Sequence, residues 1–315
     1  MPPKGYQPLD PISVDLVWSD VPSADPNERQ RQLLCALPSE AVRLAIGQAD
    51  SSGNITFGPF TAHAKTGSYV VVLDYIKYES KSLQVIVSET LPADLQLMTD
   101  KLYATDDADA GIDKSSLQDQ VAAARAKYFR DLPYWARPFS IRPVTGGLPK
   151  LYMDEELFDV PIYVGIGVRM VASVTVSDTT VNLGSLYGLA TSAQENKLQG
   201  TLIIQTLGLG GERISPHIPL PSEINVTTIQ NVIQALATIK SKLYDPNASV
   251  VPVVLALDDF VGRPGAKEQL VSALRADHGE VRRLLIGRGC DGVTPPANAG
   301  AKPGDTSVRP EKSGP

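Results

Sequence analysis

The sequence contains few of the residues that carry most enzymatic chemistry. Among its 315 residues there are two cysteines and three histidines. Cys35 and Cys290 are too few for a disulfide framework or a cysteine zinc site, and three histidines far apart in the sequence do not indicate a histidine metal site. We therefore expect reduced cysteines, a cytoplasmic location and no bound cofactor.

Long apolar segments and blocks of like charge are also missing. No segment reaches the ~18 apolar residues that a membrane-spanning helix needs, and the first residues lack the apolar run of a secretory signal. The formal net charge is −6, from 29 basic and 35 acidic residues, and there is no basic stripe. We therefore expect no nucleic-acid partner, and no pattern identifies a small-molecule ligand.

The composition itself is that of an ordinary globular protein, with 43% hydrophobic and 20% charged residues. A chain of this length forms one large domain or two of ordinary size. Composition predicts five segments along the chain. They are a flexible arm (1–11), an N-terminal β-rich half with a helical end (12–137), a linker (138–149), an α+β half (150–293) and a disordered tail (294–315).

Strands dominate the pattern of the first half. Alternating or β-branched segments predict strands at residues 41–48, 54–63, 68–78 and 83–88. Glu79-Ser80-Lys81 is predicted to close a hairpin between the last two of these strands. Two helices are expected. One begins at Asp25-Pro26, since proline suits the first helical position, and the other follows Ser115, which forms a capping box with Gln118.

The second half alternates strands with helices. Residues from Val164 to Ser177 alternate between apolar and small or polar side chains, which predicts a long strand. Asn225 is suited to cap a helix whose apolar face recurs from Ile229 to Leu243, and the apolar segment Val250–Leu257 predicts a buried strand. We expect an α+β fold with largely antiparallel mixed sheets, several helices and disordered N- and C-terminal tails.

Asp258 and Asp259 are the leading candidates for a chemical site. They follow a buried strand, where open α/β sheets place ligand-binding loops, and carboxylate oxygens are ligands that suit Mg²⁺. The pair therefore predicts a metal site and, with it, a metal-assisted hydrolase. The alternative is that the two carboxylates only turn the chain into solvent at the end of a strand.

Three further patterns do not match the sites that they resemble. Cys290 follows His278 at a distance of twelve residues, but it borders the tail, whereas a nucleophile needs a rigid scaffold. The acidic segment from Asp106 to Asp113 does not place its carboxylates at the positions of a calcium loop. The glycines from Gly208 to Gly211 are followed by prolines instead of a helix, so they do not form a phosphate-binding loop.

The long alternating strand allows a different interpretation. About ten alternating residues suffice for a β-strand that enters a membrane, and pore-forming proteins hide such segments in a soluble form. The residues that would enter the membrane are Val164, Ile166, Val168, Met170, Val174 and Val176. An ordinary twisted sheet produces the same pattern, so the membrane is an alternative target without independent support.

The small number of reactive residues favours a protein without catalytic activity. We expect a soluble binding or self-assembling protein that acts through protein–protein contacts, with another protein or further copies of itself as the partner. The alternatives are a metal-assisted hydrolase that uses Asp258 and Asp259, and a membrane-acting, pore-forming effector with a hidden amphipathic β-hairpin.

Overall fold

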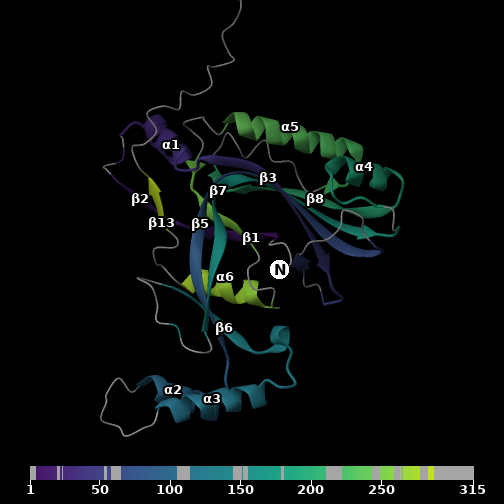
Figure 1. Ribbon diagram of the computed structural model, residues 1–315. Helices are drawn as coiled ribbons and strands as arrows, with labels where there is room; N and C mark the ends of the chain where they lie inside the picture. Colours follow the sequence, from purple (N-terminus) through teal and green to yellow (C-terminus); the bar gives the residue numbers. More distant parts are fainter. Residues whose placement is uncertain are drawn as a thin grey trace, which may run out of the picture.

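The computed structural model describes residues 5–19, 22, 24–52, 55–57, 65–104, 114–144, 151, 155–178, 181–210, 222–242, 249–258, 263, 265–276 and 283–286. Within these residues it shows the expected α+β fold, with six α-helices and a nine-stranded antiparallel sheet that is nearly closed into a barrel (Figure 1). Two pairs of short strands, β2 with β13 and β9 with β11, lie outside the large sheet.

The bounds of the elements are as follows. The strands are β1 (Tyr6–Ser13), β2 (Asp15–Trp18), β3 (Ser39–Ala49), β4 (Ile55–Phe57), β5 (Gly67–Glu89), β6 (Phe139–Pro143), β7 (Glu155–Val176), β8 (Leu198–Leu207), β9 (Leu209–Gly210), β10 (Ser222–Glu223), β11 (Ser249–Val250), β12 (Val253–Asp258) and β13 (Arg283–Ile286). The helices are α1 (Pro26–Cys35), α2 (Ala93–Ala104), α3 (Lys114–Tyr128), α4 (Leu186–Gln194), α5 (Val226–Lys242) and α6 (Ala266–Ala276), with a 3-10 turn η1 (Tyr134–Ala136).

Two very long strands, β5 and β7, form the spine of the sheet. They pair in antiparallel fashion along their whole length, from Gly67 opposite Val176 to Ser88 opposite Glu155. The outer edge of each is shared between two partners, because β5 pairs with β3 and then β6, while β7 pairs with β12 and then β8. At the end of the order, β1 pairs with β12 and contacts β3, which nearly closes the barrel.

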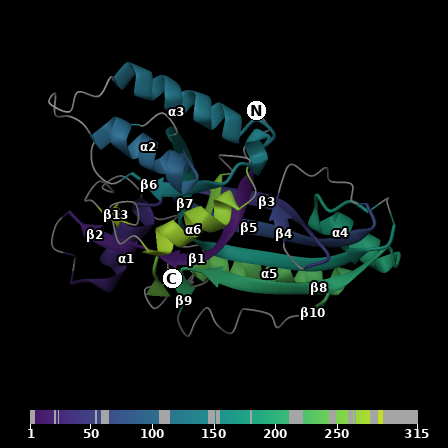
Figure 2. The ribbon, with the colours of Figure 1, turned by 90° about the horizontal axis from the view of Figure 1, so that it is seen from below.

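Glycines on β7 allow the spine to bend sharply. A Cβ atom at Gly165 would lie 2.2 Å from the Lys77 carbonyl oxygen, and one at Gly167 would lie 2.3 Å from that of Tyr75. Neither approach is open to a larger residue unless the backbone moves, and glycine at such points is how strongly curved sheets are built. The two strands curve together as a result (Figures 1 and 2).

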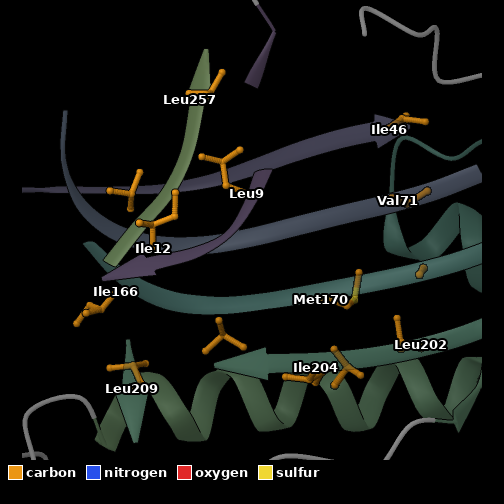
Figure 3. Packing of buried hydrophobic residues seen from close by; sticks show 14 of the residues in the cluster. Leu9, Ile12, Ile46, Val71, Ile166, Met170, Leu202, Ile204, Leu209 and Leu257 are labelled. Atoms are coloured by element: carbon orange, nitrogen blue, oxygen red, sulfur yellow. The ribbon is translucent and has the colours of Figure 1, made fainter. Parts of the chain in front are cut away.

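The main hydrophobic core lies on one face of the curved sheet. Alternate residues of β7, including Ile166 and Met170, point into it, together with residues such as Ile204 of β8 (Figure 3). Helix α5 covers this face with Ile229, Val232 and Ile239 and begins behind Asn225, whose side chain accepts a hydrogen bond from the Thr228 backbone N–H. The opposite face holds a smaller cluster around Ile76, Tyr163 and Leu255.

A buried ion pair crosses the centre of the sheet. Asp74 of β5 lies directly opposite Arg169 of β7, and their side chains are 0% and 5% exposed. The Arg169 guanidinium donates from Nε to Asp74 Oδ1 at 2.8 Å and from Nη2 to Oδ2 at 2.7 Å. The Tyr6 hydroxyl donates to the same carboxylate at 2.6 Å, and burial followed by the Asp74 charge raises the pKa of Tyr6.

The same guanidinium also satisfies two backbone carbonyls. Nη1 donates to the Leu9 oxygen at 2.5 Å and Nη2 to the Leu255 oxygen at 3.0 Å. Leu9 falls where the β1–β12 pairing shifts register, and Leu255 falls where the β12–β7 pairing does. Such irregularities leave backbone groups without ladder partners, and a buried carbonyl without a donor is costly. Arg169 therefore joins four strands of the barrel.

A helical hairpin projects from the barrel. Helices α2 and α3 pack on each other at the end of β5, with β6 and α6 between this lobe and the rest of the molecule (Figure 1). The lobe has a small core of its own, formed by Leu91, Leu95, Val121 and Phe129. Helix α3 begins close to the predicted Ser115 start, whereas α2 has no strong start motif and was not expected.

Several expectations about local structure are wrong. Glu79-Ser80-Lys81 does not close a hairpin but continues β5, because these residues pair with β7. Residues 6–11 form most of β1, not a loose arm, and the predicted linker contains β6, which pairs with β5. The large sheet takes strands from both predicted halves. The predicted tail, 294–315, lies outside the described residues.

Cys35, the last residue of α1, is disulfide-bonded. The expectation of reduced cysteines is therefore wrong for this residue. The cytoplasmic location stays a prediction. Cys290, the other cysteine of the sequence, lies outside the described residues. No helix in the described part of the chain is both long and apolar enough to cross a membrane.

The Asp74–Arg169 pair predicts a large effect of a single substitution. Arg169→Met leaves the Asp74 carboxylate buried without its cation, so the free energy of unfolding should fall by about 3–5 kcal/mol. Urea denaturation measures this change. Arg31→Gln, which breaks the exposed pair with Glu28 on α1, is the matched control and should change the stability little. Equal effects of the two substitutions would contradict the central role of Arg169.

Candidate functional site

The structure places one of the two predicted metal ligands. Asp258 ends β12, opposite Tyr6 of β1, and its Oδ1 accepts a hydrogen bond from the Tyr163 hydroxyl at 3.1 Å. Burial, followed by the Asp258 charge, raises the pKa of Tyr163 to about 12. Asp259 lies outside the described residues, among which no group of three His, Cys, Asp or Glu residues could hold a metal ion. The metal site stays a prediction.

The residues of the predicted membrane hairpin lie in the main core. They belong to β7, they are at most 4% exposed, and their neighbours on both sides are paired strands: Val164, Ile166, Val168, Met170, Val174 and Val176. Entry of this strand into a membrane would have to expose that core. Nothing in the structure tests such a change, so the pore-forming effector also stays a prediction.

The remaining candidates contribute little. Gly208 has a positive φ of 64° at the bend between β8 and β9, which only glycine adopts readily. The other candidate residues all lie outside the described residues: Cys290, His63, His217, His278 and the acidic segment 106–113. The structure indicates a candidate site at another place in the molecule.

That place is a pocket where the helical lobe joins the sheet. It has a volume of about 190 Å³ and is lined by Val87, Glu89, Arg125, Tyr134, Arg137, Glu156 and Arg263. These residues come from the end of β5, from α3, from η1 and the residue behind it, from the start of β7 and from the segment before α6. The lobe must fold onto the sheet for the pocket to form.

Glu89 is a lining residue of the pocket that contacts two of its arginines. It accepts hydrogen bonds from Arg125 Nη2 at 2.5 Å and from Arg137 Nη1 at 2.9 Å, and its side chain is 10% exposed. Burial raises the pKa of Glu89, but the hydrogen bonds and charges of the two arginines outweigh burial and lower it below the ordinary value. Glu89 is therefore ionised, and its carboxylate accepts hydrogen bonds from two arginines.

Arg263 has no comparable carboxylate. The residue is 6% exposed, and its guanidinium lies 3.6 Å from the ring centroid of Tyr134 and 5.2 Å from that of Phe139. Nε and Nη1 are buried and have no acceptor within the described part of the chain. Stacking on aromatic rings orients a guanidinium, but it leaves the N–H groups in the plane of the fork without hydrogen bonds. This is the feature of the pocket that the fold does not require.

Glu156 lies on the other side of Tyr134. Its Oε2 accepts a hydrogen bond from the Tyr134 hydroxyl at 3.3 Å. Burial raises the pKa of Tyr134, the Arg263 charge opposes this, and the Glu156 charge adds to it. Three arginines against two glutamates leave the lining with an excess of one positive charge.

The arrangement suits recognition of a planar anion. A guanidinium stays protonated at all relevant pH values and presents a rigid fork of donors that matches a carboxylate. Among the described residues the lining contains no cysteine, histidine, serine or lysine. The pocket offers charge and hydrogen bonds.

Two wider hollows adjoin the pocket. One, of about 430 Å³, shares Glu89, Arg125 and Arg137 with it and is also lined by Ala122, Ala126 and Phe129. The other, of about 540 Å³, shares Glu89 and is also lined by polar residues of α2 and β6 that include Gln96, Thr99, Ser140 and Arg142. Glu89 therefore lines all three hollows.

The sequence alone does not predict this pocket. Its arginines come from positions 125, 137 and 263, in segments with no shared motif. No pattern along the chain shows that these side chains meet, because the contact depends on how the lobe packs against the sheet.

Comparison with known proteins adds no further assignment. No protein-family model, curated protein or solved structure matches this chain. The proposed function therefore rests on the fold and on the geometry of the pocket.

The lowered pKa of Glu89 predicts how acid affects the protein. In the unfolded chain the carboxyl binds a proton near its ordinary pKa of about 4.5, whereas in the fold it stays ionised to lower pH. Its contribution to stability is therefore present above pH ~4.5 and is lost as the pH falls through the folded pKa. Glu89→Gln removes this contribution, so the stability difference between the wild type and this variant should shrink below pH ~4.5.

Chemical denaturation at a series of pH values between about 3 and 7 measures that difference. Glu195→Gln is a suitable control, because the pair between Glu195 and Lys197 is largely exposed. Stability curves of the wild type and Glu89→Gln that stay parallel throughout would show that the Arg125–Glu89–Arg137 cluster does not form.

Proposed function

We propose that this protein is a binding protein without catalytic activity that holds a carboxylate group in the pocket lined by Arg125, Arg137 and Arg263. The observation that carries the proposal is the buried Arg263 guanidinium, whose Nε and Nη1 have no acceptor among the described residues. Leaving buried charged donors without hydrogen bonds costs free energy. A bound carboxylate would supply the acceptors.

The charges of the pocket favour a carboxylate over a phosphate. The lining carries one excess positive charge, which a single carboxylate neutralises. A phosphate carries about two negative charges at neutral pH and would lie close to Glu89 and Glu156, so repulsion would oppose its binding. Guanidinium and carboxylate also match as two parallel hydrogen bonds.

The surroundings of the pocket agree with the expectation of protein–protein contacts. Trp135, next to Tyr134 in η1, is 62% exposed, and Tyr134 itself is 42% exposed. Tryptophan, tyrosine and arginine are the residues that most often dominate protein interfaces. No observation on the described residues favours the metal-assisted hydrolase or the pore-forming effector over a binding protein.

Carboxylate binding predicts a specific response to Arg263 substitution. Propionate should bind the full-length protein, with perturbed NMR resonances around the pocket, whereas inorganic phosphate at the same concentration should leave them unchanged. Arg263→Gln should weaken propionate binding at least about tenfold, because a hydrogen bond to a charged group is worth about 1.5–3 kcal/mol. Arg263→Lys, which keeps the charge but loses the fork, should be intermediate.

The matched control is Arg275→Gln, which removes an exposed arginine of α6 and should leave binding unchanged. Thermal unfolding of each variant shows whether it is folded. Equal affinity for propionate in the wild type and in folded Arg263→Gln would refute the proposed function.

A further inference from the structure

Starting from the proposed carboxylate binding, we infer that the carboxylate belongs to a glutamate or aspartate side chain within an extended peptide segment of a partner protein. The size of the pocket suits a single acidic side chain. Pockets for drug-sized molecules measure roughly 300–1,000 Å³, whereas the pocket beside Arg263 measures about 190 Å³. It therefore accepts a group as small as one acidic side chain.

Two hollows adjoin the pocket. The hollow along α3 shares Glu89, Arg125 and Arg137 with it, and the hollow along α2 and β6 shares Glu89. A ligand anchored at Arg263 would therefore have two further hollows within reach. An extended chain, whose residues continue from the anchor in both chain directions, can fill such adjoining hollows, whereas a compact molecule held in the pocket alone cannot.

The two flanking hollows offer contacts that suit a peptide. Along α3, Ala122, Ala126 and Phe129 offer small and apolar contacts. Along α2 and β6, Gln96 and Ser140 offer hydrogen-bonding groups of the kind that peptide N–H and C=O groups need. The exposed Trp135 follows Tyr134 of the pocket lining in the sequence and is a residue of the kind that anchors protein partners.

The charge of the whole chain supports a selective site. The protein carries a formal net charge of −6, so an acidic peptide is repelled by the molecule at large and attracted only where arginines gather. Arg125, Arg137 and Arg263 gather at this pocket. Long-range repulsion combined with a local anchor lets the site reject acidic segments that cannot also fill the flanking hollows.

The experiment compares two pools of blocked, fluorescently labelled pentapeptides. Both have mixed uncharged residues at the four outer positions, and the central residue is glutamate in one pool and glutamine in the other. Fluorescence anisotropy with the full-length protein should show that the glutamate pool binds at least tenfold more tightly than the glutamine pool. It should also bind at least tenfold more tightly than N-acetyl-glutamate amide, which has the anchor without the flanking chain.

Two variants separate the anchor from the flanking hollows. Arg263→Gln should weaken binding of both the peptide pool and propionate at least about tenfold. Ala126→Glu, at an exposed position of α3 in the flanking hollow, should weaken binding of the glutamate pool several-fold and leave propionate binding unchanged. Ala123→Glu, at an exposed position of α3 that lines none of the three hollows, adds the same single negative charge to the same helix and should change neither.

Several outcomes would overturn the inference. If propionate and N-acetyl-glutamate amide bind as tightly as the peptide pool, or if Ala126→Glu has no effect, the ligand is a small acid and the proposed carboxylate binding alone survives. If none of these probes binds, both proposals fail. Self-association of the protein that Arg263→Gln abolishes, without binding of the peptide pool, would assign the carboxylate to a second copy of this chain.

Discussion

The Arg169 guanidinium lies where β7 changes its partner from β12 to β8, and it is tied by hydrogen bonds to β1, β5 and β12 at once. The regular pairing of β1 with β12 and of β12 with β7 is interrupted near this point. A carbonyl at each interruption, that of Leu9 and that of Leu255, accepts a hydrogen bond from Arg169. The two interruptions therefore share one buried cation, which in turn depends on the Asp74 carboxylate for its charge balance.

Arg263 also has a buried guanidinium, but the described part of the protein does not satisfy all of its nitrogens. Both arginines are buried, at 4% and 6% exposure. Arg169 donates through all three of its guanidinium nitrogens to protein oxygens, whereas two nitrogens of Arg263 have no acceptor in the described part of the chain. A guanidinium whose three nitrogens all donate to protein oxygens is accounted for by the fold. One that is oriented by two aromatic rings but not satisfied is better explained by a ligand, and two further hollows adjoin the pocket beside it.

The sequence predicted what depends on neighbouring residues and missed what depends on distant ones. Helices α1 and α5 begin behind Asp25 and Asn225 as expected, because a cap acts within one turn. The alternation of β7 was visible, but β5 was divided at Glu79–Lys81, since only pairing with residues 162–164 keeps that polar segment in a strand. Asp74 and Arg169 are 95 residues apart, and the arginines of the pocket come from three separate segments. No local pattern records these contacts.

The contrast between the two arginines is directly measurable from the exchange of their guanidinium Nε protons with solvent, observed by nitrogen-15 NMR. We expect one Nε proton, assigned to Arg169 by its loss in Arg169→Lys, to be protected with or without ligand. The Nε proton of Arg263, assigned in the same way, should exchange rapidly in the free protein and become protected when propionate is added. Protection of the Arg263 proton in the free protein equal to that of Arg169 would show that Arg263 is already satisfied within the fold, and would contradict the account of the pocket as a binding site.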